Sequence, residues 1–184
     1  GQRTTDDRRS CNRNNPHPAR LLTNRKLNAP GSAKDTRHLE ISLEGSDLAY
    51  EVGDALGVMP VNCPVLVEEV LATIGFKGEE LVKDPAGCDV PLHEALLRHY
   101  AITQPPLALV QAAAERANHR ELLGLLAPGK KAELDPWLYG RDLVDVLLAC
   151  KGAGFSPAEF IECLRKLQPR LYSISSSPKA HPSQ

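Results

Sequence analysis

The sequence of 184 residues is poor in aromatic side chains and has no long apolar run. Aromatic residues make up 4% of the chain, and tryptophan and methionine occur once each. A membrane-spanning helix needs about 18 or more consecutive apolar residues, and no such stretch is present. The polar start, GQRTTDDRRSCNRNNPHP, also lacks the apolar core of a secretory signal. We therefore expect a cytoplasmic protein with no membrane partner.

The sequence also lacks an excess of charge and any recognisable metal-binding spacing. With 22 basic and 23 acidic residues the net charge is -1, which gives no general attraction to nucleic acid. The five cysteines are odd in number and form no CxxC pair, so neither a disulfide framework nor a zinc site is expected. We predict that most of them are buried thiols. The six histidines are scattered and are expected to be ordinary surface or hydrogen-bonded residues.

Strand patterns dominate the first third of the chain, after a polar arm. Residues 1–17 have no apolar period and are predicted to be a linker or a disordered arm. The segments ARLLTNRKL, RHLEISL and DALGVMP then read as three short strands separated by tight turns. RHLEISL alternates apolar and polar residues, which predicts a half-buried strand. Three such strands favour an antiparallel sheet or barrel.

The middle of the chain has helical periodicity. VNCPVLVEEVLATIG predicts a helix with Pro64 in its first turn and Gly75 as its terminator. Four more helical stretches follow, in PLHEALLRHY, PLALVQAAAERA, NHRELLGLL and GRDLVDVLLACKG. A last helix begins with a capping box formed by Ser156 and Glu159, and Pro169 is expected to end it. The predicted fold class is α+β: a partial antiparallel β-barrel, over 18–61 and 169–184, with a large all-helical insertion over 62–168.

The stretch PRLYSISSSP, residues 169–178, carries the side chains best suited to a ligand. In a strand, Arg170 and Tyr172 share one face, while Ser173 lies on the other unless a bulge intervenes. A guanidinium suits phosphate or carboxylate, and a phenol ring offers a flat surface for stacking. The residue types alone also fit a plain edge strand with an exposed arginine and a tyrosine in the core.

Four segments in the same order resemble the FAD-binding domain of the ferredoxin-reductase-like diflavin reductases. RLYSISSSP matches the signature RxYS, and YEVGDALGVMPVN, residues 50–62, resembles YxxGDxxGVxPxN. The entry strands from TNRKLNAPGS onward and LLRHYAIT, residues 96–103, are similar to further parts of that family. The resemblance covers about residue 17 to residue 184. The sequence GDALGV is most similar to family members of the NADPH-dependent sulfite reductase type.

The resemblance implies roles for individual residues in binding FAD. Arg170 would bind the pyrophosphate, Tyr172 would pack on the isoalloxazine ring, and Ser173 would lie beside the flavin atom that receives hydride, in a catalytic position. Leu171 would contribute backbone contacts, and Thr103 would reach FAD from the insertion. Gly53 and Asp54 are expected to shape a turn.

The resemblance further implies an NADPH-dependent flavoprotein that passes electrons through FAD to FMN, held by a flavodoxin domain, and on to a hemoprotein acceptor. The sequence ends shortly after RxYS and contains no GxGxxG, so we expect weak or no FAD binding by these residues alone and no NADPH oxidation. Two alternatives stay open: a non-catalytic helical connecting or docking module, and an unrelated α+β binding protein with a chance RxYS. Trp137 and Tyr139 could lie near a flavin, although packing roles are expected.

Overall fold

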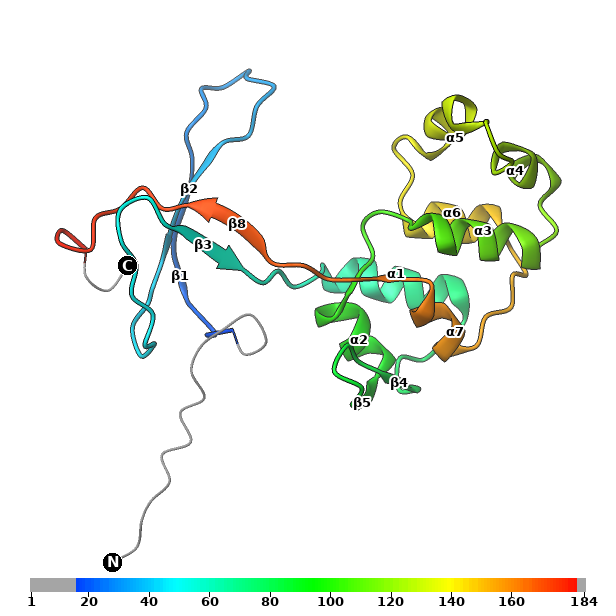
Figure 1. The fold of residues 1–184 in the computed structure, drawn as a ribbon, viewed down its shortest axis with the longest axis horizontal. Coiled ribbons are helices and arrows are strands. Elements are labelled where there is room, and N and C mark those ends of the chain that lie inside the picture. The colour runs from blue at the N-terminus through cyan, green and yellow to red at the C-terminus, as the bar shows by residue number, and fades with distance from the viewer. Residues whose placement is uncertain (1–15, 182–184) are drawn as a thin grey trace, which may run out of the picture. The chain divides into compact units, whose positions relative to one another are not determined.

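The computed structural model describes residues 16–181, and these residues divide into two compact units (Figure 1). The described part of the first unit is residues 16–59 together with 169–181, and the second unit is Pro60–Gln168. The predicted polar arm over 1–17 lies almost entirely outside the described residues, as does Cys11.

The first unit consists of two antiparallel strand pairs. Strands β1 (Leu21–Lys26) and β2 (Arg37–Ile41) form a hairpin with an irregularity between Leu21 and Thr23. Strands β3 (Ala55–Val58) and β8 (Arg170–Ser173) form the other pair. All four strands fall where alternation and turn signals predict them, because short β-branched and leucine-rich runs between glycine, proline and asparagine clusters favour extended backbone.

None of the described residues of the first unit is buried. The sequence predicts that β2 buries its apolar side, but Leu39 on that side is 45% exposed. His38 and Glu40, on the opposite side, are less exposed and hydrogen-bond each other at 2.9 Å. Ile41, on the same side as Leu39, is less exposed, so the described residues cover β2 partly on both sides and do not bury its apolar side alone.

The second unit contains the helices. They are α1 (Pro64–Ile74), α2 (Leu92–Arg98), α3 (Leu107–Arg116), α4 (Arg120–Leu125), α5 (Lys131–Leu138), α6 (Leu143–Ala149) and α7 (Pro157–Glu162). The predicted start and end of α1 are both confirmed: Pro64 occupies the first turn, and Gly75 ends the helix with a φ of 85°. The capping box of α7 is also confirmed, with Ser156 and Glu159 bonded reciprocally.

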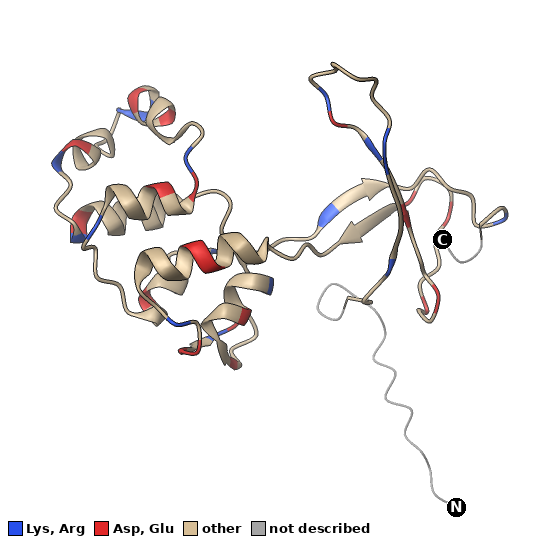
Figure 2. Ribbon diagram, turned by 180° about the vertical axis from the view of Figure 1, so that it is seen from behind, with Lys and Arg blue, Asp and Glu red and all other residues tan. Residues whose placement is uncertain are grey.

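The buried core of the described residues lies in this second unit. Its fully buried large side chains come from most of the helices and from the segment after α2; they are Phe160, Leu92, Leu96, Ile102, Leu109, Leu122, Leu143, Val67, Val70, Val110, Val146 and Cys150. Acidic and basic residues are interspersed along its ribbon (Figure 2), and Glu68 and Glu69 are exposed residues of α1. The helices therefore pack as amphipathic elements around one core.

The predicted all-helical insertion is wrong, because the second unit also holds two small antiparallel pairs. Strands β4 (Leu81–Lys83) and β5 (Asp89–Pro91) pair across a turn. Strands β6 (Tyr100–Ala101) and β7 (Arg165–Lys166) join segments far apart in the sequence. Helix α7 accordingly ends at Glu162, well before Pro169, because the chain turns into β7.

The prediction that most of the cysteines are buried is also wrong for the described residues. All four described cysteines are free thiols, and only Cys150 among them is buried. Cys63 and Cys88 are exposed, and Cys163 is intermediate. Burial raises the pKa of the Cys150 thiol above its ordinary value.

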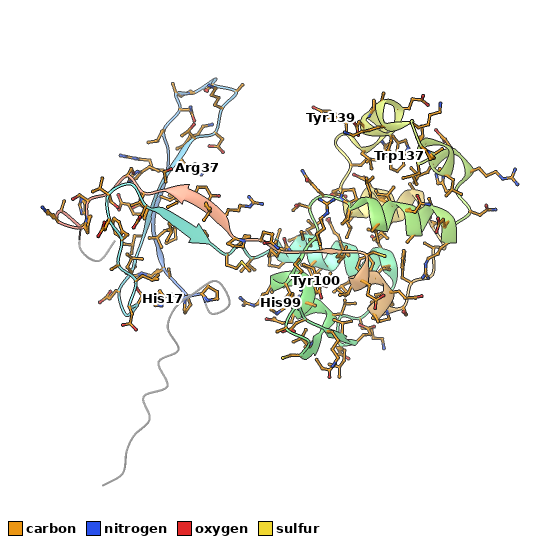
Figure 3. The ribbon with its side chains drawn as sticks, viewed as in Figure 1. His17, Arg37, His99, Tyr100, Trp137 and Tyr139 are labelled. Atoms are coloured by element: carbon orange, nitrogen blue, oxygen red, sulfur yellow. The ribbon has the colours of Figure 1, made fainter. Side chains whose placement is uncertain are left out.

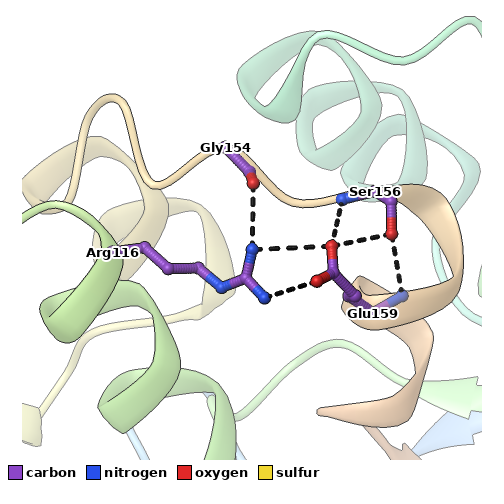
Figure 4. Close-up of polar contacts among 4 residues, drawn as sticks. All are labelled: Arg116, Gly154, Ser156 and Glu159. Atoms are coloured by element: carbon purple, nitrogen blue, oxygen red, sulfur yellow. Dashed lines mark hydrogen bonds and ion pairs between the residues drawn. The ribbon is translucent and has the colours of Figure 1, made fainter.

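A charged clamp joins the end of α3 to the start of α7 (Figure 4). The Arg116 guanidinium donates to the Glu159 carboxylate at 2.7 Å and to the Gly154 carbonyl at 3.0 Å, and it lies over the Phe155 ring. Ser156 donates to the same carboxylate from its backbone N–H and its hydroxyl. The Arg116 bond, followed by those from Ser156, lowers the pKa of Glu159 to about 2.

Asn62 fixes the point where the chain enters the second unit. It is the one buried polar residue among the described residues, with 8% of its surface exposed. Its side-chain amide donates to the carbonyls of Leu96 and Tyr100, each at 2.7 Å, and its backbone N–H donates to the Leu97 carbonyl at 2.9 Å. Three hydrogen bonds thus tie the start of this unit to the end of α2 and to β6.

Candidate functional site

The two segments that carry the strongest resemblance form one β-ladder. Strand β3 comes from YEVGDALGVMPVN and β8 from RLYSISSSP, and residues 59–169 separate them in the chain. Their register is regular, from Ala55 opposite Ser173 to Val58 opposite Arg170. The ladder continues one step further, because the Ile174 N–H donates to the Asp54 carbonyl at 3.0 Å. The pairing brings together, within the first unit, residues that are far apart in sequence.

The turn before β3 forms as the sequence predicts. Gly53 has a φ of 101°, a conformation that favours glycine. The Asp54 carboxylate accepts the Glu51 N–H at 2.8 Å, and the Asp54 N–H donates to the Glu51 carbonyl at 3.1 Å. Gly53 and Asp54 therefore serve the turn that leads into β3.

Strand β8 presents its predicted binding residues on accessible surface. Arg170, Leu171, Tyr172 and Ser173 are all exposed, and Tyr172 is 49% exposed. Because β8 pairs without a bulge, Arg170 and Tyr172 lie on one face and Ser173 lies on the other. Tyr172 is therefore not the core tyrosine that a plain structural strand would carry.

The side chains of β8 are also chemically available. Within the described residues, the Arg170 guanidinium has no ion-pair partner, and the Tyr172 and Ser173 hydroxyls make no hydrogen bond to protein. The strand thus offers a free fork of N–H donors and a free aromatic face two residues apart. This donor set fits a ligand that combines a flat ring system with phosphate groups.

The remaining predicted residue, Thr103, belongs to the second unit. It lies exposed at a bend between β6 and α3, where the segment after α2 leaves the core. Trp137 and Tyr139 belong to α5 and its C-terminal end (Figure 3). Trp137 packs against the core and lies under the Arg141 guanidinium, as a packing role predicts. Tyr139 is 89% exposed, so a packing role for it is wrong.

Sequence reasoning missed a side-chain link between the same two segments. The Tyr50 and Ser176 hydroxyls are hydrogen-bonded at 2.8 Å, although the residues are 126 positions apart. Tyr50 is the first residue of the matched segment YEVGDALGVMPVN. Its place in that segment was the only sequence feature that pointed to a role for Tyr50. Sequence reasoning also missed the Glu40 carboxylate, which accepts from Thr23 at 2.9 Å and contacts His38. The His38 contact, followed by the Thr23 bond, lowers the pKa of Glu40.

Other features of the described residues do not add to this site. A hollow of about 260 Å³ in the second unit is lined by residues that include Tyr100, Ile161 and Lys166, and by none of the predicted site residues. No three His, Cys, Asp or Glu side chains of residues 16–181 are grouped so as to hold a metal ion. None of the helices described above has the length and apolarity needed to cross a membrane.

Comparisons with known proteins point to one family. The family described as "FAD binding domain" matches residues 9–184. The flavoprotein alpha-component of NADPH sulfite reductase from Bacillus subtilis (strain 168) is 46% identical over 95% of this chain, and its counterpart from Mannheimia succiniciproducens is 43% identical over 90%. That from Neisseria meningitidis serogroup B is 41% identical over 96%. The chain covers 29%, 27% and 28% of the lengths of these three relatives.

Proposed function

The chain belongs to the FAD-binding domain family, and from that premise we propose that it is the FAD-binding portion of an NADPH-dependent diflavin oxidoreductase of the sulfite-reductase flavoprotein type. Such a protein passes electrons from NADPH through FAD to FMN and then to an acceptor protein. The observation that carries the proposal is the β3–β8 ladder, because it assembles the two matched segments into one accessible site.

Each residue of β8 has a role that its chemistry supports. Arg170 binds the pyrophosphate with its planar guanidinium, since two parallel N–H donors match phosphate oxygens. Tyr172 stacks its exposed ring on the flavin. Leu171 contributes backbone contacts between the two.

Ser173 is the residue proposed to act at the reacting end of the cofactor. FAD supplies the hydride and electron chemistry when it is bound. Ser173 would hydrogen-bond the reacting edge through its free hydroxyl and its backbone N–H and so hold that edge in one orientation. Thr103 is proposed to reach the same cofactor from the second unit.

The same proposal assigns the wider architecture. The strand pairs of residues 18–61 and 169–184 are part of an antiparallel β-barrel, and residues 62–168 are a connecting insertion. NADPH, a flavodoxin domain with FMN and a hemoprotein acceptor interact with other parts of such a protein, in the cytoplasm. Its relatives are named as components of NADPH sulfite reductase, which supports a hemoprotein that reduces sulfite as the acceptor.

FAD binding tests the proposal, in the 184-residue chain and in a chimera that continues after residue 184 with the C-terminal sequence of the Bacillus subtilis relative. We expect the chimera to copurify with FAD and to reduce a dye with NADPH, and the chain alone to bind FAD weakly or not at all. Strand edges that residues 16–181 leave unpaired weaken binding by the 184-residue chain. A chimera that folds but holds no FAD would contradict the proposal.

Substitution of the stacking ring tests the role of β8 within that chimera. Tyr172→Ala is expected to weaken FAD binding about tenfold or more, because it removes the aromatic contact with the flavin. Tyr139→Ala is the matched control: it removes an equally large and 89% exposed ring from the second unit and should leave FAD affinity unchanged. Equal affinities for the two variants would contradict stacking by Tyr172.

A further inference from the structure

A hydroxyl pair closes the open end of the β3–β8 ladder. The last paired residues at this end are Ala55 and Ser173, and the bond from the Ile174 N–H to the Asp54 carbonyl follows. Beyond it, the Tyr50 and Ser176 hydroxyls meet at 2.8 Å, and both residues are partly buried. Ser173 is therefore the last residue of the regular ladder before the Tyr50–Ser176 bond.

The position of this bond matters because strand ends open easily. Ladder ends with few buried contacts have the lowest local opening energies in a protein, and no described residue of this unit is buried. A hydrogen bond three residues beyond Ser173 restrains the backbone that leaves β8. The same contact attaches that backbone to Tyr50, just before the Gly53–Asp54 turn.

We infer that Tyr50 is a positioning residue: through Ser176 it holds Ser173 and the adjacent end of β8 in the geometry required at the flavin. This inference rests on the proposed FAD-binding function. Tyr50 acts on the strand and is assigned no contact with the cofactor. Its hydroxyl, and not its ring, is the group that the inference requires.

The first test measures local opening in the 184-residue chain by amide hydrogen exchange. Tyr50→Phe and Ser176→Ala should each accelerate exchange of the Ile174 N–H by roughly three- to tenfold, which corresponds to the loss of one hydrogen bond. The double variant should exchange no faster than Tyr50→Phe, because Tyr50→Phe already removes the bond to Ser176. Ser175→Ala, the exposed neighbour, is the matched control and should change nothing.

The second test measures the bound flavin in the chimera described above. Tyr50→Phe should weaken FAD binding by roughly three- to tenfold and alter the visible circular dichroism of the flavin, whereas the thermal midpoint of the helical unit stays unchanged. A general structural role would not change the flavin spectrum at constant stability. Tyr139→Phe, which removes a hydroxyl in the second unit, should leave spectrum and affinity as in the unsubstituted chimera.

The outcomes separate the inference from the proposed function. If the chimera holds FAD and Tyr50→Phe leaves its affinity and spectrum unchanged, the positioning role is overturned and the proposed function stands. If the unsubstituted chimera holds no FAD, the proposed function fails and the positioning role fails with it. Unchanged exchange of the Ile174 N–H in Tyr50→Phe overturns the inference without any FAD measurement.

Discussion

Replacing Asn62 should destabilise the second unit by an amount that follows from its hydrogen bonds. The side-chain amide donates to two carbonyls at 2.7 Å in a site that is 8% exposed. Asn62→Ala removes both donors. The Leu96 and Tyr100 carbonyls then lack a hydrogen-bond donor in a site that excludes water. At about 1–2 kcal/mol for each buried acceptor left unpaired, the free energy of unfolding should fall by about 2–4 kcal/mol.

Asn62→Asp should show the same defect with a distinctive pH dependence. An ionised carboxylate would face two carbonyl oxygens, and none of these groups can donate a hydrogen bond. Burial and this repulsion raise the folded-state pKa of the new carboxyl above its unfolded value. The variant should therefore be most stable when the group is protonated, and should lose stability as pH rises through the folded-state pKa.

Urea unfolding followed by far-ultraviolet circular dichroism measures both variants, because the helices of the second unit dominate that signal. Gln104→Ala is the control: Gln104 is exposed, and its substitution should change the unfolding free energy by less than about 0.5 kcal/mol. The reasoning is refuted if Asn62→Ala is as stable as the control. A pH profile of Asn62→Asp that runs parallel to the unsubstituted chain would refute the electrostatic part.

Two further predictions concern the core and the charged clamp. Phe160→Ala should lower the unfolding free energy by about 3–5 kcal/mol in the urea assay, because Phe160 is 0% exposed. Leu148 is 48% exposed, so Leu148→Ala should lower the unfolding free energy far less. Similar losses in the two variants would contradict the assigned core. The clamp holds the pKa of Glu159 at about 2, below its ordinary 4.5, so its stabilisation is complete above pH 4.5 and lost as pH falls towards 2. The difference in thermal midpoint between the unsubstituted chain and Glu159→Gln should therefore shrink between pH 5 and pH 2. A constant Glu159→Gln difference would contradict the clamp with Arg116.

Sequence patterns predicted the elements whose signals are local. Helix α1 begins at its predicted proline and ends at its predicted glycine, and the capping box of α7 forms as predicted. The patterns failed where the determining contact is distant or the element is very short. Strands β6 and β7 have two residues each and depend on pairing across most of the second unit, so no period could reveal them. Helix α5 was missed because Pro136 lies inside it, and proline normally argues against a helix interior.

In the candidate site, too, local features could be predicted from the sequence and distant contacts could not. Periodicity predicted that β8 is a strand and that Arg170 and Tyr172 share a face, because alternation is a local property. Its partner could not be predicted in this way, since strand pairing leaves no mark on either segment alone. The resemblance identified β3 and β8 as parts of two signatures of one family, and the ladder supplies the physical reason why the two segments belong together. The Tyr50–Ser176 bond escaped both approaches, because neither signature includes a serine at that position.

The two glycines of the GDALGV segment differ in what the described residues explain. Gly53 needs its lack of a side chain, because its φ of 101° is strained for any other residue. Gly57 has no such conformation, and a Cβ built on it would lie 3.7 Å from the Leu171 side chain, an ordinary contact. Glycine within a strand is typical of a place where another backbone or a ligand approaches closely. Gly57 lies directly opposite Leu171, on the face of the ladder that carries Ser173 and not Tyr172, so the described residues give no structural reason for a glycine there.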